Sequence, residues 1–241
     1  MANAIELVDF SYSYPDGTRA LSGITLSVEH GRRVALIGPN GAGKSTLLLA
    51  MAGFVKGQGK VFVDGLEVTR KNIKKIRRLL GCCLENADDQ LFMPTLFDDI
   101  AFGPLNMGLE GEQAETKVRE TLEVVGLTGM GDKAPHHLSA GQKRAAAIAA
   151  VLAMSPKIIT FDEPDGSLDP SNRKNLLRLL AGLSQTLVIA TCNIDFAAAV
   201  AERAVLIDSG RIIADGDAEE VMHDAELMTG HGLEVPQRRS K

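Results

Sequence analysis

The segment GPNGAGKS at residues 38–45 constrains the fold of this chain more than any other. It satisfies the G-x-x-x-x-G-K-[ST] pattern and lies between an apolar run, RVALI, and a helical pattern, KSTLLLAMAGF. Glycines at this spacing let the backbone bend so that successive N–H groups point into one concavity, next to the positive end of the following helix. A turn without a ligand would explain the glycines but not the Gly-Lys-Ser-Thr order. The segment therefore predicts a phosphate-binding loop between a strand and a helix.

The residues of this loop have distinct expected contacts with a nucleotide and its metal ion. Lys44 is expected to bridge the β- and γ-phosphates, and the Ser45 hydroxyl is expected to bind Mg²⁺. The predicted phosphate-binding residues are Gly38, Pro39, Asn40, Gly41, Ala42, Gly43, Lys44, Ser45 and Thr46.

A pair of acidic residues follows a second apolar run that begins at residue 157. Asp162 would project from the strand end towards the phosphates and is a predicted Mg²⁺ ligand. Glu163 is predicted to act as a general base on an attacking water. Taken alone, the pair is explained equally well as a helix N-cap, with Pro164 beginning the next turn. The phosphate loop favours the catalytic interpretation.

Apolar runs and helical patterns alternate along the 241 residues, which predicts an α/β fold with a mostly parallel sheet. Buried strands are expected at 33–38, 157–163 and 186–191. Alternation of apolar and polar residues in IELVDFSYSYP, ALSGITLSVEHG and KVFVDG predicts an antiparallel β-layer near the N-terminus. Turns are expected at FGPLNMG and GMGDKAPHH, and a frayed end at PQRRSK.

The same patterns predict one domain with an inserted part. Its expected parts are a core with the β-layer at about 1–87 and 155–216, a helical subdomain at about 88–154, and a short C-terminal helical tail at 217–241.

The balance of charged residues argues against a nucleic-acid-binding function. The chain has 31 acidic and 26 basic residues, a formal net charge of -5, and no basic concentration of the kind that nucleic-acid-binding proteins use. No nucleic-acid partner is therefore expected. The densest basic run, RKNIKKIRR at 70–78, has helical spacing and is expected to form a solvated helix face, with contact to a partner as the alternative.

Cysteine usage and apolar runs indicate the compartment. Cys82, Cys83 and Cys192 have neither the number of a disulfide framework nor paired zinc-ligand spacing, so a reducing, cytosolic setting is expected. The N-terminus lacks a signal-peptide pattern, and the apolar stretch at 145–154 is far shorter than the ~20 residues of a membrane span. We expect the chain to be soluble by itself, which leaves docking onto a membrane partner open.

LSAGQKR at 138–144 lies between the phosphate loop and the acidic pair, and there it resembles the signature of ABC-type ATPases, usually LSGGQ. The resemblance covers nearly the whole chain: Tyr14 ahead of the phosphate loop, GPNGAGKST, a strand end at LEN, LSAGQ, TFDEP, SLD at 167–169, and ATCN. It implies a P-loop NTPase with a RecA-like, mostly parallel sheet core, an N-terminal antiparallel β-layer and an inserted helical signature subdomain. It also implies hydrolysis of ATP with Mg²⁺.

In that family two such domains meet head to tail and enclose two ATP molecules. The resemblance implies that Tyr14 stacks on adenine and that Asp169 lies at the dimer contact. The residues that would reach the γ-phosphate bound by the other subunit are Ser139, Ala140, Gly141 and Gln142. Free N–H groups at the start of a helix favour such an anion.

Finer features resemble the energy-coupling-factor importers, especially the cobalt and nickel group. They are YSYPDGTRAL, NADDQLFMPTLFDDIAFGPLNMGL, HHLSAGQKR and DGDAEEVMHDAELMTGHGLEVP. The resemblance implies a peripheral subunit at the cytoplasmic face that powers a membrane importer, with a second ATPase subunit in a homodimer or heterodimer. The stretch near 86–107 would belong to the groove that receives helices of a membrane scaffold protein. The alternative is a soluble regulatory or assembly ATPase without a transport role.

A separate membrane component would handle the transported metal. His136 and His137 are adjacent and therefore expected to point apart, so a capping or packing role is expected for them in place of metal ligation.

Two positions depart from the family pattern. The family usually has Thr-His-Asp where this chain has Thr191, Cys192 and Asn193, and a Gln where this chain has Glu85. A thiol is a weak hydrogen-bond donor and cannot replace the reach of imidazole. The Glu85 carboxylate would still suit Mg²⁺ but adds negative charge beside the γ-phosphate. Both residues are catalytic candidates, with slow or partner-dependent hydrolysis as the expected result. Cys192 as a small buried filler is the alternative.

Overall fold

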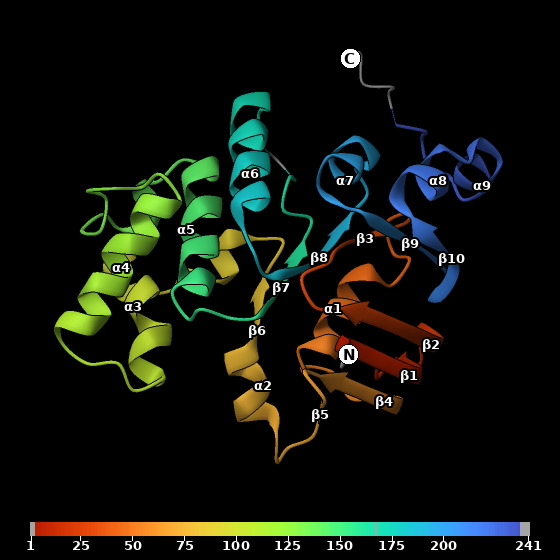
Figure 1. The fold of residues 1–241 in the computed structure, drawn as a ribbon, viewed down its shortest axis with the longest axis horizontal. Coiled ribbons are helices and arrows are strands. Elements are labelled where there is room, and N and C mark those ends of the chain that lie inside the picture. Colours follow the sequence, from red (N-terminus) through yellow and green to blue (C-terminus); the bar gives the residue numbers. More distant parts are fainter. Residues whose placement is uncertain (1–2, 167, 237–241) are drawn as a thin grey trace.

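The computed structural model describes residues 3–166 and 168–236 (Figure 1). Ser167, the first residue of the predicted SLD contact, lies outside the described residues, and so does most of the predicted frayed end, residues 237–241.

A six-stranded sheet forms the centre of the molecule, with the strand order β10-β9-β3-β8-β7-β6. Neighbouring strands from β9 to β6 pair in parallel, and β10 pairs antiparallel to β9. The strands are β3 (Arg33–Ile37), β6 (Leu80–Cys83), β7 (Ile158–Asp162), β8 (Thr186–Thr191), β9 (Arg203–Asp208) and β10 (Arg211–Asp217). The central strands β3, β7 and β8 match the three predicted ones to within a residue at each end.

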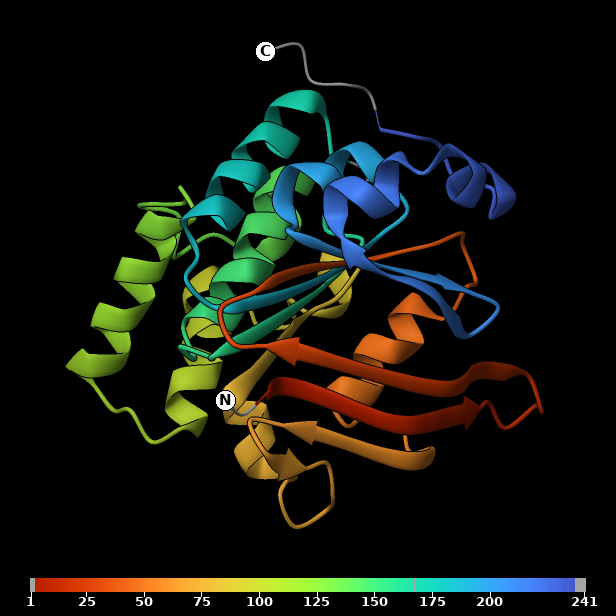
Figure 2. The same cartoon turned by 45° about the vertical axis from the view of Figure 1, so that its right-hand side comes forward.

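The parallel strands are apolar on both faces because helices or the second sheet cover each face. Successive residues of β3 enter different clusters: Val34 packs towards α1 (Lys44–Met51), and Ala35 packs towards the helices of the opposite face. These covering helices, seen above the sheet in Figure 2, are α6 (Pro170–Gly182), α7 (Ile194–Val200), α8 (Ala218–His223) and α9 (Ala225–Gly230).

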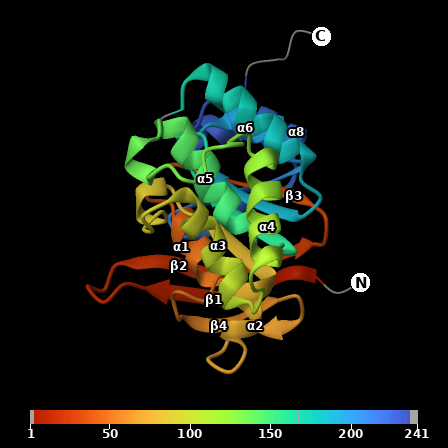
Figure 3. The ribbon, with the colours of Figure 1, turned by 90° about the vertical axis from the view of Figure 1, so that its left-hand side faces the viewer.

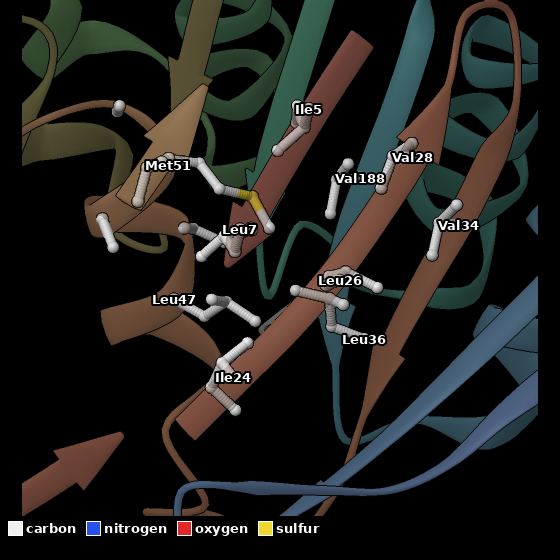
Figure 4. Packing of buried hydrophobic residues seen from close by; sticks show 14 of the residues in the cluster. Ile5, Leu7, Ile24, Leu26, Val28, Val34, Leu36, Leu47, Met51 and Val188 are labelled. Atoms are coloured by element: carbon white, nitrogen blue, oxygen red, sulfur yellow. The ribbon is translucent and has the colours of Figure 1, made fainter. Parts of the chain in front are cut away.

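The predicted antiparallel layer is a second sheet with the order β2-β1-β4-β5. Helix α1 lies between the two sheets, and one apolar cluster joins all three (Figures 2 and 4). Leu26 of the second sheet, Leu36 of the central sheet and Leu47 of α1 are all at most 2% exposed. The strands are β1 (Asn3–Ser13), β2 (Arg19–Glu29), β4 (Gln58–Val63) and β5 (Leu66–Glu67).

The inserted helices pack around an apolar cluster of their own, which runs from Leu91 to Ala153 and supports the proposed subdomain at 88–154 (Figure 3). They are α3 (Leu96–Asn106), α4 (Glu112–Val124) and α5 (Ala140–Leu152). Helix α2 (Ile73–Leu79) precedes β6, and only Ile76 of this helix is buried.

One predicted turn is wrong. FGPLNMG was expected to break the chain, but α3 continues through it to Asn106 with Pro104 inside the helix. Proline removes one backbone donor. Here it lies near the helix end and is buried, and Gly103 before it lies against Met154, so packing outweighs the turn preference.

Candidate active site

The phosphate loop connects the end of β3 to α1, and close backbone contacts require glycine at positions 38 and 43. A Cβ on Gly38 would lie 2.0 Å from the carbonyl oxygen of Ile207, and a Cβ on Gly43 would lie 2.7 Å from that of Ala20. Gly43 also has a φ of 107°, which disfavours other residues. No side chain caps the N-terminus of α1, so its first N–H groups face the loop and suit an anion.

Lys44 is buried, with 5% of its surface exposed, and its ammonium group is held inside this loop. Nζ donates hydrogen bonds to the carbonyl oxygens of Gly38 at 2.8 Å and Pro39 at 3.2 Å, and it lies 3.5 Å from Oε1 of Glu163. A buried charge needs such partners. The predicted phosphate-binding lysine and the predicted base are therefore in direct contact.

The predicted metal ligands also meet. The Ser45 hydroxyl donates a hydrogen bond to Oδ1 of Asp162 at 2.9 Å. Burial raises the pKa of Asp162, the charges of Glu163 and Glu85 raise it further, and the Ser45 hydrogen bond and Lys44 oppose the shift. A hydroxyl and a carboxylate are oxygen ligands that suit Mg²⁺, and a cation would reduce the repulsion among the three carboxylates. The residues present fit the metal that the sequence predicts.

Glu163 is held in an uncommon backbone conformation, with a φ of 41°. Its N–H donates to the carbonyl oxygen of Ala190 at 2.8 Å, and Oε2 of its side chain accepts a hydrogen bond from the backbone N–H of Cys192 at 3.1 Å. Neighbouring strands β7 and β8 thus position the carboxylate. Backbone strain of this kind is common at functional sites.

Cys192 is exposed, so its interpretation as a small buried filler is wrong. Desolvation and the negative charge of Glu163 raise the pKa of its thiol, which therefore stays neutral near pH 7. The backbone N–H of Cys192 donates to Glu163, and the Cys192 thiol also interacts with the Glu163 carboxylate.

Tyr14 and Glu85 lie at the margins of this site. The Tyr14 hydroxyl is 2.8 Å from Oγ1 of Thr46, and the Tyr14 side chain is exposed. Glu85 has an exposed side chain whose charge raises the pKa of Asp162. The carbonyl oxygen of Glu85 accepts a hydrogen bond from Arg144 of α5.

The predicted signature residues form a second group. Ser139 and Gln142 build a capping box at the start of α5: Oγ of Ser139 accepts from the N–H of Gln142, and Oε1 of Gln142 accepts from the N–H of Ser139. A Cβ on Gly141 would lie 2.5 Å from the Asn172 amide. That amide donates to Asp169, which caps α6. Among the described residues, no hydrogen bond or ion pair joins this group to Lys44, Ser45 or Asp162.

Sequence reasoning missed the buried carboxylate of Asp165, which is 4% exposed. It accepts hydrogen bonds from Oγ1 of Thr191 at 3.0 Å and from Nδ2 of Asn193 at 2.7 Å, and Nε of Arg173 lies 3.9 Å away. An aspartate at 193, as the family usually has, would place a second carboxylate against Asp165. Two features of the sequence could have indicated this pair: Asp165 lies two positions after Glu163, and Asn193 replaces the aspartate that the family usually has.

Arg144 is a second missed residue: it ends the quoted segment LSAGQKR, but no role was predicted for it. It is 8% exposed and donates to the carbonyl oxygens of Leu84 at 2.7 Å and Glu85 at 2.5 Å. A basic residue beside the small apolar face AAAIAAVLA was the available signal.

The described residues contain no group of three His, Cys, Asp or Glu side chains placed to hold a metal ion. His136 and His137 pack against each other with ring centroids 4.2 Å apart, in a turn of 3₁₀-helix. The expectation that the two rings point apart is therefore wrong, and both side chains are exposed, so a capping or packing role for them stays a prediction.

Comparisons with known proteins agree with the geometry. The family model described as ABC transporter matches residues 21–166. The energy-coupling factor transporter ATP-binding protein EcfA of Methanothermobacter thermautotrophicus is 47% identical, over 96% of this chain and 76% of that protein. A putative ABC transporter ATP-binding protein of Gloeobacter violaceus is 44% identical, over 98% of each chain.

Solved structures show the same fold. The structure of cbiO1 from Clostridium perfringens, titled as part of the ABC transporter complex cbiONQ, superposes with a TM-score of 0.84 at 34% identity, over 95% of this chain and 94% of that one. The dimeric structure of a bacterial ABC transporter cassette gives a TM-score of 0.80 at 27% identity, over 89% of this chain and 98% of that one.

Proposed function

The chain belongs to the ABC transporter family and is an ABC-type ATPase of the energy-coupling-factor branch, and we propose that it powers a membrane importer. The proposed cargo is cobalt or nickel ions. We place it at the cytoplasmic face of the membrane as a peripheral subunit. Among the described residues, no helix combines the length and the apolar character needed to cross a bilayer.

In the proposed reaction, the phosphate loop and the N-terminus of α1 bind the phosphates of ATP, and Lys44 turns its ammonium group to them. Mg²⁺, held by Ser45 and Asp162, would neutralise phosphate charge. Glu163 takes a proton from the attacking water, and the N–H of Cys192 and Lys44 keep its carboxylate in place. Tyr14 would contact the adenine from the end of β1, where its hydroxyl already reaches Thr46.

Dimer closure is proposed because the site residues form two separate groups. Ser139, Gly141 and Asp169 surround the start of α5 and α6, away from the loop that holds Lys44. A second copy, or a related ATPase, placed head to tail would bring its signature group to the phosphates bound here. The similarity to a dimeric cassette structure supports this arrangement.

The observation that favours transport over a soluble regulatory role is an exposed apolar surface on the inserted helices. We call it the docking surface; it consists of Phe92, Phe102 and Leu105, with exposed fractions of 63%, 45% and 52%. The rings of Phe92 and Phe102 pack edge to face with centroids 5.1 Å apart. Apolar side chains gathered in this way mark a partner site, and helices of a membrane scaffold protein fit it.

The metal cargo is proposed from the resemblance of residues 86–109 and of the late segment DGDAEEVMHDAELMTGHGLEVP to the cobalt and nickel group. Since no cluster of metal-binding side chains occurs in the described part of the chain, another component would select the ion.

We expect Phe92→Ser combined with Phe102→Ser to abolish co-purification with a co-expressed membrane scaffold protein of this transporter type, because the change removes the apolar contact. ATP binding by the isolated variant should stay unchanged, since neither ring contacts the phosphate loop. The measurement is affinity co-purification in detergent together with nucleotide binding. Val124→Ser is the matched control, because Val124 is 59% exposed on α4. Full retention of the partner by the double variant would refute docking at this surface.

A further inference from the structure

Residues 56–78 carry a concentration of positive charge in a chain whose net charge is -5. The segment contains eight basic residues and two acidic ones. We call the eight the basic surface; all are exposed: Lys56, Lys60, Arg70, Lys71, Lys74, Lys75, Arg77 and Arg78. None of them forms an ion pair with a described acidic residue, and Asp64 is already bound by His30 and Lys157.

The basic surface surrounds a hollow with an apolar floor. A cavity of about 430 Å³ lies between the edge of the antiparallel sheet, the end of α1 and helix α2. Its lining combines cations, one carboxylate from Glu67 and apolar side chains, among them Lys60, Arg70, Arg77, Val61, Val68 and Ile73. Phe54 beside it is 57% exposed, and the guanidinium of Arg77 lies 5.3 Å from the centre of its ring.

The basic surface belongs to the end of the molecule that also carries the docking surface. Helix α2 lies at the bottom of Figures 1 and 3, in the half that holds α3 and opposite the C-terminus. Phe102 and Leu105 of the docking surface are on α3. A protein that docks through α3 onto a membrane partner therefore presents α2 to the same membrane.

We propose that the basic surface binds the anionic headgroups of phospholipids in the membrane that contains the partner. This inference rests on the proposed function. The cations supply charge complementarity, and Phe54 with the apolar floor matches the boundary between headgroups and acyl chains. Nucleic acid is disfavoured because the cations are interleaved with apolar residues and lie beside a surface suited to a membrane protein. Near an anionic bilayer, each Lys or Arg strengthens binding by about fivefold.

The test is co-sedimentation of the isolated protein with phosphatidylcholine vesicles that contain or lack phosphatidylglycerol. Binding is expected only with the anionic lipid, and it should weaken as salt rises, since the screening length falls from about 10 Å at 0.1 M to about 3 Å at 1 M. Lys71→Glu, Lys74→Glu and Lys75→Glu together, which we call the α2 variant because these residues lie in α2 or just before it, should weaken vesicle binding by 10²-fold or more, because three attractions become repulsions. The matched control reverses three exposed charges elsewhere, at Lys174, Arg178 and Arg211, and should bind as the parent does.

Three results would overturn the proposal: equal binding to neutral and anionic vesicles, full binding by the α2 variant, or retention of a short DNA duplex by the same lysines without vesicle binding. The α2 variant should still assemble with the membrane partner in detergent, and loss of that assembly would reassign the basic surface to a protein contact. The vesicle assay contains no membrane partner, so a negative result there would not contradict docking through Phe92 and Phe102. A negative result in the docking experiment would likewise not contradict vesicle binding.

Discussion

The Glu163 carboxylate lies between the ammonium group of Lys44 and the backbone N–H of Cys192. Any residue except proline at position 192 would supply that N–H, so the backbone contact to the base does not depend on the side chain. The Cys192 thiol is neutral and a weak hydrogen-bond donor. It therefore cannot act as a second polar group that reaches beyond Glu163 towards the phosphates. The departures at Cys192 and Glu85 therefore alter turnover more than positioning of the base.

Cys192→His should raise the rate of ATP hydrolysis, by up to about 10²-fold, because imidazole adds a positioned donor where charge develops. ATP affinity should change little. Glu85→Gln should couple to this effect, because Glu85 and the Cys192 site act on the same group of carboxylates. Steady-state hydrolysis of the four combinations at 85 and 192, with and without the membrane partner, measures both effects.

Cys192→Ser is the matched control for that series, since it replaces the thiol with a small hydroxyl that keeps the backbone contact. A Cys192→His variant that binds ATP but is no faster than the parent in either setting would show that this position does not limit the site.

Single residues show where sequence reasoning succeeds and where it stops. Lys44, Ser45, Asp162 and Glu163 were predicted to converge because each follows the carboxyl end of a strand. The pairing of Asp165 with Asn193 was not predicted, because it joins residues 28 positions apart and depends on β7 and β8 being neighbours. The local pattern of residues in the sequence does not reveal which strands are neighbours in the sheet.

At the scale of elements, helix α5 links the signature to the segment that precedes the docking surface. Arg144 binds the carbonyl oxygens of Leu84 and Glu85, and Gln90 donates to the carbonyl oxygen of Ala147 at 2.7 Å. Lys143 pairs with Asp88 at 2.6 Å. Contacts on successive turns of one helix hold it firmly to residues 84–90, so displacement of that segment by a partner would displace the start of α5.

Asp99 of α3 allows a test of how the docking segment is held. It is 4% exposed; Oδ1 accepts from the N–H groups of Phe92 and Met93 at 3.0 Å, and Oδ2 has no partner among the described residues. Burial raises the pKa of Asp99. The folded state thus binds more protons than the unfolded state between the ordinary pKa of about 3.9 and the raised value, and the free energy of unfolding falls as pH rises through that window.

Asp99→Asn keeps the acceptor and removes the charge. Its free energy of unfolding, relative to wild type, should therefore increase as pH rises from below about 3.9 towards neutrality. Urea unfolding at a series of pH values measures this difference. Asp99→Ala serves as the comparison: it leaves two N–H groups without an acceptor and should therefore be about 1–3 kcal/mol less stable than Asp99→Asn at every pH. A difference between wild type and Asp99→Asn that is independent of pH would contradict the prediction.

Helices and strands were predicted accurately where the pattern of apolar residues was clear. Prediction failed where tertiary packing determines the end of an element. The strands β3, β7 and β8 are continuous apolar runs and were found. The hairpin β9–β10 was not predicted, although RAVLID and RIIADGD flank the turn residues Ser209 and Gly210. The end of α3 was misplaced because Pro104 is a turn signal that burial overrides.

At the scale of the whole molecule, the two groups of site residues lie on different parts of one chain. Lys44 and Glu163 belong to the central sheet and its loops, and Ser139 and Gly141 open a helix of the inserted part. No hydrogen bond or ion pair joins the signature residues to Lys44, Ser45 or Asp162 among the described residues. We propose that a second subunit completes the site, and that closure depends on ATP because the bound phosphates would lie between the two groups.

Glu163→Gln should convert a protein that associates only transiently into a stable ATP-bound dimer. The glutamine retains a carbonyl oxygen for the N–H of Cys192, so the site keeps its shape, but the amide cannot accept a proton from water, so cleavage stops before the subunits separate. Sedimentation velocity with and without MgATP measures the change.

Lys44→Ala in the same background is the control and should remain monomeric, because it loses the ammonium group that the phosphates require. A Glu163→Gln protein that stays monomeric at saturating MgATP, while binding the nucleotide, would refute closure between two copies and leave a heterodimer with a related ATPase to be tested by mixing the two.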